Sequence, residues 1–182
     1  LKTASEYGKG IRVLNQEPWE TLCSFIISQN NNIKRIKGII SRLCENFGEK
    51  IQGGYTFPTP EKLAGLTVDD LKELRAGFRV KYIIDAAKKV SSGEVNLNNL
   101  KNLSTDEARA ILMKIKGVGP KVADCALLFS HKHISAFPKD VWIKRAMQVL
   151  FNGELPTEAQ PFAGIIQQYI FFYARETKLE IE

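Results

Sequence analysis

Apolar residues recur along most of the chain at the three- and four-residue spacing of amphipathic helices. After Pro18, the apolar side chains of residues 19–26 share one helical face, and a longer stripe runs from Ile33 to Phe47 before Gly48. A further stripe covers residues 80–87, and no alternating run reaches the length of a strand. The pattern therefore predicts an all-α protein.

Residues with capping chemistry mark where several helices begin. Thr59 stands directly before Pro60, and Ser104 stands three residues before Glu107, as in a capping box. We therefore expect helices to open after these residues, with residues 49–58 forming the loop before the first.

A further helix is predicted from Thr67 and Asp70, which resemble another cap. It would end at Gly77 and bury three apolar side chains, those of Val68, Leu71 and Leu74.

Composition limits the class of protein. The 182 residues carry a net charge of +6, and 44% of them are apolar, enough for a sizeable core. No apolar run approaches the roughly 20 residues of a membrane span, and the first residues lack the apolar segment of a signal peptide. We therefore expect a cytoplasmic, nucleoid or nuclear protein that is not secreted. Because the chain does not begin with Met, we expect a fragment or a processed product.

The cysteines and histidines do not form a metal-binding pattern. Cys23, Cys44 and Cys125 are far apart within apolar helical stripes, which favours buried free thiols and excludes a four-cysteine iron–sulfur or zinc site. His131 and His133 have no further ligands nearby and are predicted to lie in a solvated loop. The sequence thus indicates no required cofactor.

Residues 104–129 carry the sharpest motif. A capped helix runs into Gly117-Val118-Gly119, and a second helix starts at Pro120, the pattern of a helix-hairpin-helix. Two glycines let the backbone turn tightly and approach a ligand, and the free amides of a helix N-terminus form an anion site. We predict that DNA phosphate binds here, at Gly117, Gly119 and Val122. An ordinary helical hairpin is the alternative.

Two charged residues near this hairpin have both a structural and a catalytic interpretation. Lys121 lies in the first turn of the second helix, where a cation is unfavourable, so it either contacts phosphate or acts as a nucleophile. Asp140 is positioned to cap the next helix, but it could also return to the hairpin and stabilise positive charge on a sugar carbon. The spacing alone leaves both alternatives open.

Three consecutive amides, residues 30–32, separate two apolar helices. Asn serves as a C-cap, a turn residue and an N-cap. At least one of the three amides should remain free to meet a ligand.

Taken together, these motifs resemble the superfamily of DNA glycosylases that combines a helix-hairpin-helix, a Gly/Pro-rich loop and an Asp. The segments 117–125 and 137–141 carry that resemblance, while residues 24–36, 76–82 and 161–167 resemble the 8-oxoguanine DNA glycosylase family. The resemblance covers nearly all of residues 1–182 and implies a single domain with two helical lobes around a cleft. The iron–sulfur cysteines of the endonuclease III and adenine glycosylase branches are absent.

The family implies a bifunctional enzyme that flips 8-oxoguanine from duplex DNA, cleaves its N-glycosidic bond and nicks the abasic site. By motif match, Lys121 would be the Schiff-base nucleophile and Asp140 its electrostatic partner. The resemblance implies that Cys125, Gln167 and Phe171 contact the flipped base. It also implies that Asn30, Arg35 and Arg79 contact the cytosine left unpaired, and that Phe78 inserts as a wedge into the gap. It also implies a monovalent-cation site at the backbone carbonyls of Met113, Ile115 and Val118.

The chain departs from the family in several places. We expect this chain to lack the family's N-terminal β-rich lobe, which would leave recognition of the lesion incomplete. Phe78 stands where Tyr is common, Lys139 where a small apolar residue is usual, and Trp142 where His is common. The alternatives are a non-catalytic DNA-binding module and a glycosylase for another damaged base. The expected partner is double-stranded DNA, with no membrane, and the chain is expected to be a monomer.

Overall fold

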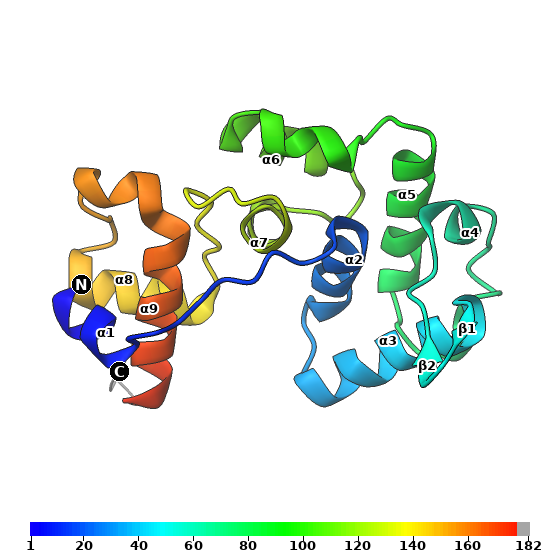
Figure 1. Ribbon diagram of the computed structural model, residues 1–182, viewed down its shortest axis with the longest axis horizontal. Coiled ribbons are helices and arrows are strands. Elements are labelled where there is room, and N and C mark those ends of the chain that lie inside the picture. The colour runs from blue at the N-terminus through cyan, green and yellow to red at the C-terminus, as the bar shows by residue number, and fades with distance from the viewer. Residues whose placement is uncertain (178–182) are drawn as a thin grey trace.

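A computed structural model describes residues 1–177, and the described chain is predominantly helical (Figure 1). The α-helices are α1 (Lys2–Tyr7), α2 (Pro18–Ser28), α3 (Ile33–Phe47), α4 (Pro60–Ala64), α5 (Arg79–Ser91), α6 (Thr105–Leu112), α7 (Pro120–Ser130), α8 (Val141–Phe151) and α9 (Ala163–Glu176). Three 3₁₀ turns join them, namely η1 (Lys72–Leu74), η2 (Leu97–Asn102) and η3 (Thr157–Phe162). The all-α prediction is confirmed.

Two separate apolar clusters divide the helices into two lobes. The larger cluster collects buried side chains from α2 to α7, with Leu22, Ile26, Ile83 and Leu112 fully buried. The smaller cluster lies between α8 and α9, around Ile143 and Ile170, and α1 packs against α9. Figure 1 shows α7 between the two lobes, with α2 beside it, so the N-terminus of α7 lies where the lobes meet.

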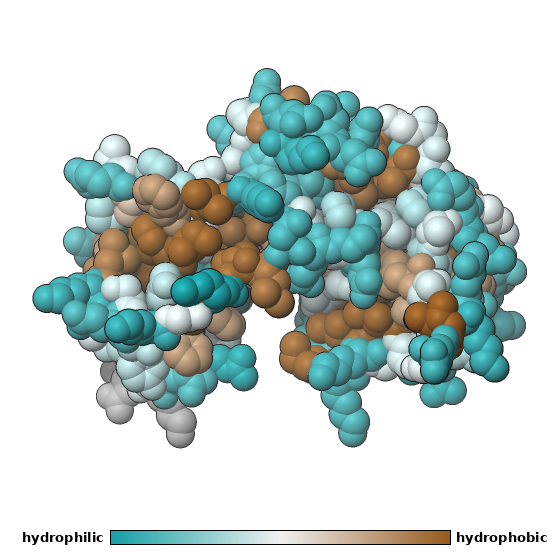
Figure 2. All heavy atoms as spheres, viewed as in Figure 1, coloured by the Kyte–Doolittle hydropathy of each residue, from teal (hydrophilic) through white to brown (hydrophobic). Residues whose placement is uncertain are grey.

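The smaller lobe leaves much of its apolar surface exposed, and Figure 2 shows this surface over α8 and α9. Its exposed apolar side chains are Val141, Trp142, Val149, Leu150, Phe162 and Phe172. No described helix has both the length and the apolar character needed to cross a bilayer.

Local capping chemistry explains where most helices begin. Thr59 caps α4, Ser104 and Glu107 form the full capping box of α6, and Asn32 caps α3 by accepting a hydrogen bond from the Arg35 amide. Each of these helix starts was predicted from the sequence and is confirmed.

The helix predicted after Thr67 is wrong. Thr67 and Asp70 do hydrogen-bond to each other, and Leu71 and Leu74 are buried, but the segment forms only the 3₁₀ turn η1. Arg75 follows with φ of 54°, which ends any right-handed helix, and Val68 remains exposed. Two buried leucines three residues apart fit one 3₁₀ turn as well as an α-helix.

Residues 49–58 are a loop except for one short antiparallel pair. Strand β1 (Lys50–Ile51) pairs with β2 (Gly54–Tyr55) through a turn in which Gly53 has φ of 89°. Strands of two residues are too short for an alternating pattern, so the sequence did not indicate them.

The prediction of a solvated loop at the two histidines is wrong. His131 and His133 are 6% and 9% exposed, and their Nε2 atoms lie 3.0 and 2.9 Å from the carbonyl oxygens of Leu97 and Leu100. Burial lowers the pKa of His131 below its ordinary value. The two rings therefore anchor η2 to the end of α7.

The three cysteines are free, as expected. Cys23 and Cys125 are buried and Cys44 is half-buried, and all three lie within helices. Burial raises the pKa of Cys23 well above its ordinary value, so this thiol is protonated at neutral pH.

Candidate active site and nucleic-acid interface

A cavity of about 190 Å³ lies where α7, α9 and the loop before α8 meet. It brings together five residues that the family resemblance assigned, namely Lys121, Cys125, Asp140, Gln167 and Phe171. Four residues that were not assigned also line it, namely Phe25, Phe129, Pro138 and Gln168. Typical small-molecule sites measure roughly 300–1,000 Å³. The smaller size suits one flat aromatic group whose remaining atoms stay outside.

Lys121 and Asp140 occupy the same cavity although 19 positions separate them. Lys121 is half-buried, directly after Pro120 at the start of α7. Asp140 caps α8, because one of its carboxylate oxygens accepts a hydrogen bond of 2.7 Å from the Ile143 amide. The second oxygen has no hydrogen-bond donor within residues 1–177, so the capping role leaves it available to a ligand.

The remaining cavity walls are apolar or neutral. Burial raises the pKa of Cys125 to about 11, against the opposing charge of Lys121. The Cys125 wall is therefore a neutral thiol at physiological pH. Gln167 is 5% exposed, and its amide donates a hydrogen bond of 3.3 Å to the carbonyl oxygen of Pro138. This bond fixes the Gln167 amide and joins α9 to the loop before Asp140.

The hairpin between α6 and α7 uses its two glycines for different reasons. Gly117 has φ of +80°, and a Cβ there would collide with the ring of Tyr82, so the fold itself requires this glycine. Gly119 has extended backbone angles, and a Cβ there would meet nothing within 4 Å. Within the described chain nothing accepts from the amides of Gly119, Lys121 and Val122. Gly119 thus leaves open space beside free donors, which suits a phosphate.

Helices α5 and α7 hold the hairpin in place. The Asp85 carboxylate accepts a hydrogen bond of 2.7 Å from the Lys116 amide, and the Lys89 ammonium donates one of 2.6 Å to the Lys114 carbonyl. On the other side, Arg109 donates to Asp124 at 2.6 Å, and Asp124 is 7% exposed. The Arg109 guanidinium is therefore paired with the carboxylates of Asp124 and Asp106.

The carbonyls of Met113, Ile115 and Val118 lie in this same hairpin. The Ile115 carbonyl accepts the Val118 amide at 3.0 Å, and the Lys89 ammonium lies on the carbonyl of the intervening Lys114. No group of three or more His, Cys, Asp or Glu side chains in residues 1–177 could hold a metal ion. The monovalent-cation site therefore stays a prediction that rests on backbone oxygens alone.

A second group of predicted residues gathers at the α2–α3 loop and the start of α5. Asn30 has φ of 46° and is exposed, while the Asn31 and Asn32 side chains bond to nearby backbone. Phe78 is 50% exposed, and its ring packs edge-on against Tyr82 with centroids 5.7 Å apart. Within residues 1–177 the Asn30 side-chain amide is therefore free to contact a base, and the exposed Phe78 ring is free to insert into the base stack.

The Arg79 side chain is buried and is not free to contact a DNA base in this conformation. It is 2% exposed, and its guanidinium donates to the carbonyls of Gln29, Asn30 and Ala76. Its carbon Cζ lies 4.4 Å from the centroid of the Phe78 ring. Burial and the nearby Arg35 charge lower the pKa of Arg79. In this conformation Arg79 fixes the loop and the ring, and its contact with a base stays a prediction.

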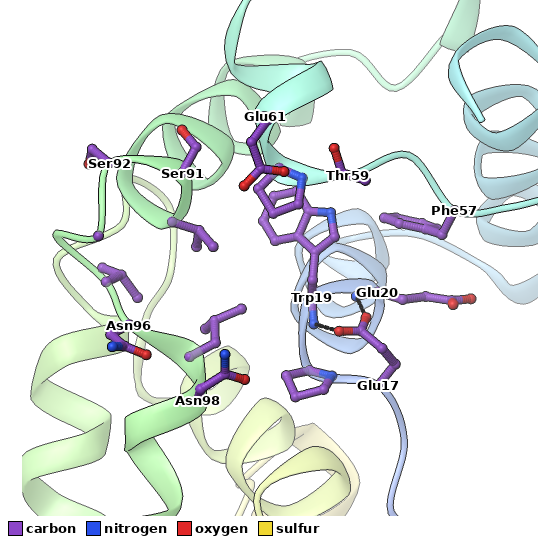
Figure 3. A pocket seen from close by; sticks show the side chains of 16 residues that line it. Glu17, Trp19, Glu20, Phe57, Thr59, Glu61, Ser91, Ser92, Asn96 and Asn98 are labelled. Atoms are coloured by element: carbon purple, nitrogen blue, oxygen red, sulfur yellow. Dashed lines mark hydrogen bonds between the residues drawn. The ribbon is translucent and has the colours of Figure 1, made fainter. Parts of the chain in front are cut away.

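Among the larger cavities of the described chain, one adjoins this site and another lies away from it. One of about 750 Å³ shares Lys121 and is lined by the cations Arg109, Lys139 and Lys144. Another of about 750 Å³, shown in Figure 3, lies at Glu17, Trp19, Glu20 and Glu61 and contains none of the predicted residues. Its three glutamates, with no basic residue in the lining, exclude it as a phosphate site.

Phe25 and Phe129 line the small cavity but were not predicted as site residues. Their rings stack with centroids 5.6 Å apart and planes inclined by 24°. Each lies on an apolar helix, so the pattern alone indicates a core position. The signal that could have found Phe25 is its place within residues 24–36, a segment that carries the resemblance.

Residues 23–160 match the family described as "HhH-GPD superfamily base excision DNA repair protein". The match covers most of the chain, and the chain belongs to this superfamily.

Similar proteins include a yeast (Saccharomyces cerevisiae) N-glycosylase/DNA lyase, 41% identical over 153 residues, which are 75% of this chain and 41% of the relative. Two solved structures resemble the present chain over almost the whole of its length. One is MBOgg1 in complex with a low-affinity DNA ligand, with a TM-score of 0.87, 48% identity, and coverage of 97% of this chain and 66% of that one. The other is the Clostridium acetobutylicum 8-oxoguanine glycosylase/lyase with double-stranded DNA containing cytosine opposite 8-oxoguanine (TM-score 0.86, 42% identity, 98% and 66% coverage). The chain thus spans less than two thirds of these relatives.

Replacing Gly119 by Ala is expected to leave the fold intact and to weaken binding to duplex DNA about tenfold, because the methyl group would occupy the space beside the free amides. Binding should be measured by fluorescence anisotropy across a range of salt, and the slope against salt should fall with the loss of a phosphate contact. The matched control is Gly65→Ala, where a methyl group also meets nothing within 4 Å. Equal affinity of the two variants for duplex DNA would show that Gly119 does not contact the DNA.

Proposed function

We propose that this chain excises 8-oxoguanine from duplex DNA and cleaves the resulting abasic site. The observation that carries the proposal is the convergence of the Lys121 amine and the Asp140 carboxylate on one base-sized cavity, next to a hairpin with free amides. The two solved relatives support the substrate, since one is named for 8-oxoguanine and both were solved with DNA.

The geometry supports a covalent route. With the flipped base between Cys125 and Phe171, its sugar remains at the mouth of the cavity beside Lys121. The Lys121 nitrogen attacks C1′ with its lone pair, the bond from C1′ to the base nitrogen breaks with its electron pair, and the base leaves after taking up a proton. The free oxygen of Asp140 stabilises the positive charge that develops on the sugar.

Strand cleavage follows from the covalent intermediate. Cleavage of the C1′–O4′ bond then opens the sugar ring, O4′ takes up the proton that the nitrogen loses, and an imine forms between Lys121 and C1′. Removal of a proton from C2′ then expels the 3′ phosphate by β-elimination, and water hydrolyses the imine to release Lys121. Each of these steps uses groups of the protein, DNA and water, so the route calls for no cofactor.

Base recognition is assigned to the neutral cavity walls. The buried Gln167 amide carries a donor and an acceptor for the pairing edge of the base. Its nitrogen also donates to the Pro138 carbonyl and its oxygen also accepts from the Gln168 amide, and these two bonds set their direction. Opposite the lesion, the exposed Asn30 and Arg35 side chains supply groups for an unpaired cytosine. Phe78 fills the gap in the stack without offering a hydrogen bond.

We expect single-turnover release of 8-oxoguanine to be faster opposite cytosine than opposite adenine, by less than about tenfold, because Phe78 lacks a hydroxyl group and Arg79 is held by carbonyls. The measurement uses matched duplexes with each opposite base, and duplexes with 3-methyladenine in place of the lesion.

The alternatives give other results. Release of 3-methyladenine without 8-oxoguanine would identify a glycosylase for another base. Tight binding of both duplexes without release of either would identify a non-catalytic module. Equal rates opposite cytosine and adenine would show that Asn30 and Arg35 do not distinguish the base opposite the lesion.

A further inference from the structure

The Phe25 ring lies beneath the Lys121 amine. The Nζ atom of Lys121 is 5.7 Å from the Phe25 centroid, within the range of a cation–π contact. Phe25 belongs to α2 and Lys121 to α7, so the contact joins two helices that pack against each other. It lies inside the 190 Å³ cavity, which both residues line.

The ring itself is held in orientation by its neighbour. Phe129 stacks on Phe25 at 5.6 Å, one ring from each helix, and both side chains are half-buried. An isolated phenyl ring on a helix could turn about its side-chain bonds, whereas a stacked pair presents a fixed face. That face is directed at the lysine.

Lys121 has few other groups to fix it. Within residues 1–177 it forms no ion pair with a carboxylate, although Asp140 lines the same cavity, and the Cys125 thiol lies one helical turn away. A lysine side chain has several freely rotating bonds, and an amine that must meet one carbon atom loses rate when it samples other directions. The aromatic face restricts that sampling.

We infer that Phe25 is a positioning residue for Lys121, and that Phe129 holds the Phe25 ring in the required orientation. The inference rests on the proposed role of Lys121 as the nucleophile. Phe25 acts through the lysine and makes no bond to the substrate carbon. It therefore affects the rate of imine formation and leaves the affinity for DNA unchanged.

The test replaces Phe25 with 3,4,5-trifluorophenylalanine, which keeps the shape of the ring nearly constant and withdraws electron density from its face. Imine formation, trapped with borohydride in single turnovers at saturating 8-oxoguanine duplex, should slow by about two- to fivefold, the factor that corresponds to a partly exposed cation–π contact. The Kd for the duplex should not change. The control places the same residue at Phe47, which packs on the larger core at the end of α3.

A Phe25→Leu variant provides a second test of the trapping rate, because leucine keeps the apolar contact and removes the aromatic face. It should slow trapping by at least as much as the fluorinated ring. An unchanged or faster rate in the fluorinated protein would overturn the inference, and so would an equal loss of affinity, which would mean that the ring contacts the base. Failure of the proposed function would give a different result. A trapped adduct that survives Lys121→Gln in an otherwise native protein would show that Lys121 is not the nucleophile.

Discussion

Replacing Lys121 by Gln is expected to lower single-turnover base release and strand nicking by about a thousandfold or more, because the variant has no amine to attack C1′. Glutamine is one atom shorter than lysine but keeps a polar group at the cavity wall, so binding to 8-oxoguanine duplex should remain within about threefold of the wild type. The measurement combines denaturing gel analysis of strand cleavage with anisotropy.

The matched control for this variant is Lys62→Gln. It removes the same charge from an exposed position in α4, outside the small cavity. Its rates should equal those of the wild type. A Lys121→Gln protein that still nicks at the wild-type rate would show that another amine, or water, performs the reaction.

Replacing Asp140 by Asn is expected to slow base release by about 10²- to 10³-fold while the protein remains as stable as the wild type. Asparagine caps a helix as well as aspartate does, so the hydrogen bond to the Ile143 amide is retained. The charge that would face the sugar is lost. Excision rates and thermal melting of the same preparation separate these two effects.

Asp140→Ala is the companion variant. It loses both the charge and the cap, and α8 should be destabilised by about 0.5–2 kcal/mol. If Asp140→Asn excised the base within about threefold of the wild-type rate, Asp140 would be a helix cap without a catalytic role.

Local sequence signals predicted most helix boundaries correctly, because a cap is a contact between residues three positions apart. The capping box of Ser104 and Glu107 needs only residues of the first turn of α6. The segment after Thr67 shows the limit of such signals. Its cap forms, but burial of Leu71 and Leu74 is achieved by one 3₁₀ turn, and tertiary packing decides between the two conformations.

Long-range contacts explain what the sequence could not reveal. His131 and His133 resemble loop residues until the carbonyls of Leu97 and Leu100, more than thirty positions earlier, are placed beside them. The buried partner of Arg109 is similar, because Asp124 lies on the next helix of the hairpin. Neither pairing leaves a periodic trace in the sequence.

The candidate site was predicted in part. The family resemblance singled out Lys121, Asp140, Cys125, Gln167 and Phe171, and the structure places them around one cavity. Phe25 was not singled out, because an aromatic residue on an apolar helix face has the pattern of a core residue. The burial of Arg79 was also not predicted, since the Gln29 and Asn30 carbonyls come from a distant loop.

The central claim, that Lys121 forms the covalent bond to the sugar, is tested most directly by identifying the trapped residue. The wild-type chain is incubated with 8-oxoguanine duplex and borohydride, digested with a protease, and analysed by mass spectrometry. The predicted result is a reduced sugar adduct on Lys121 alone. An adduct on a different lysine or on the N-terminal amine, or base release with no adduct at any residue, would contradict the account.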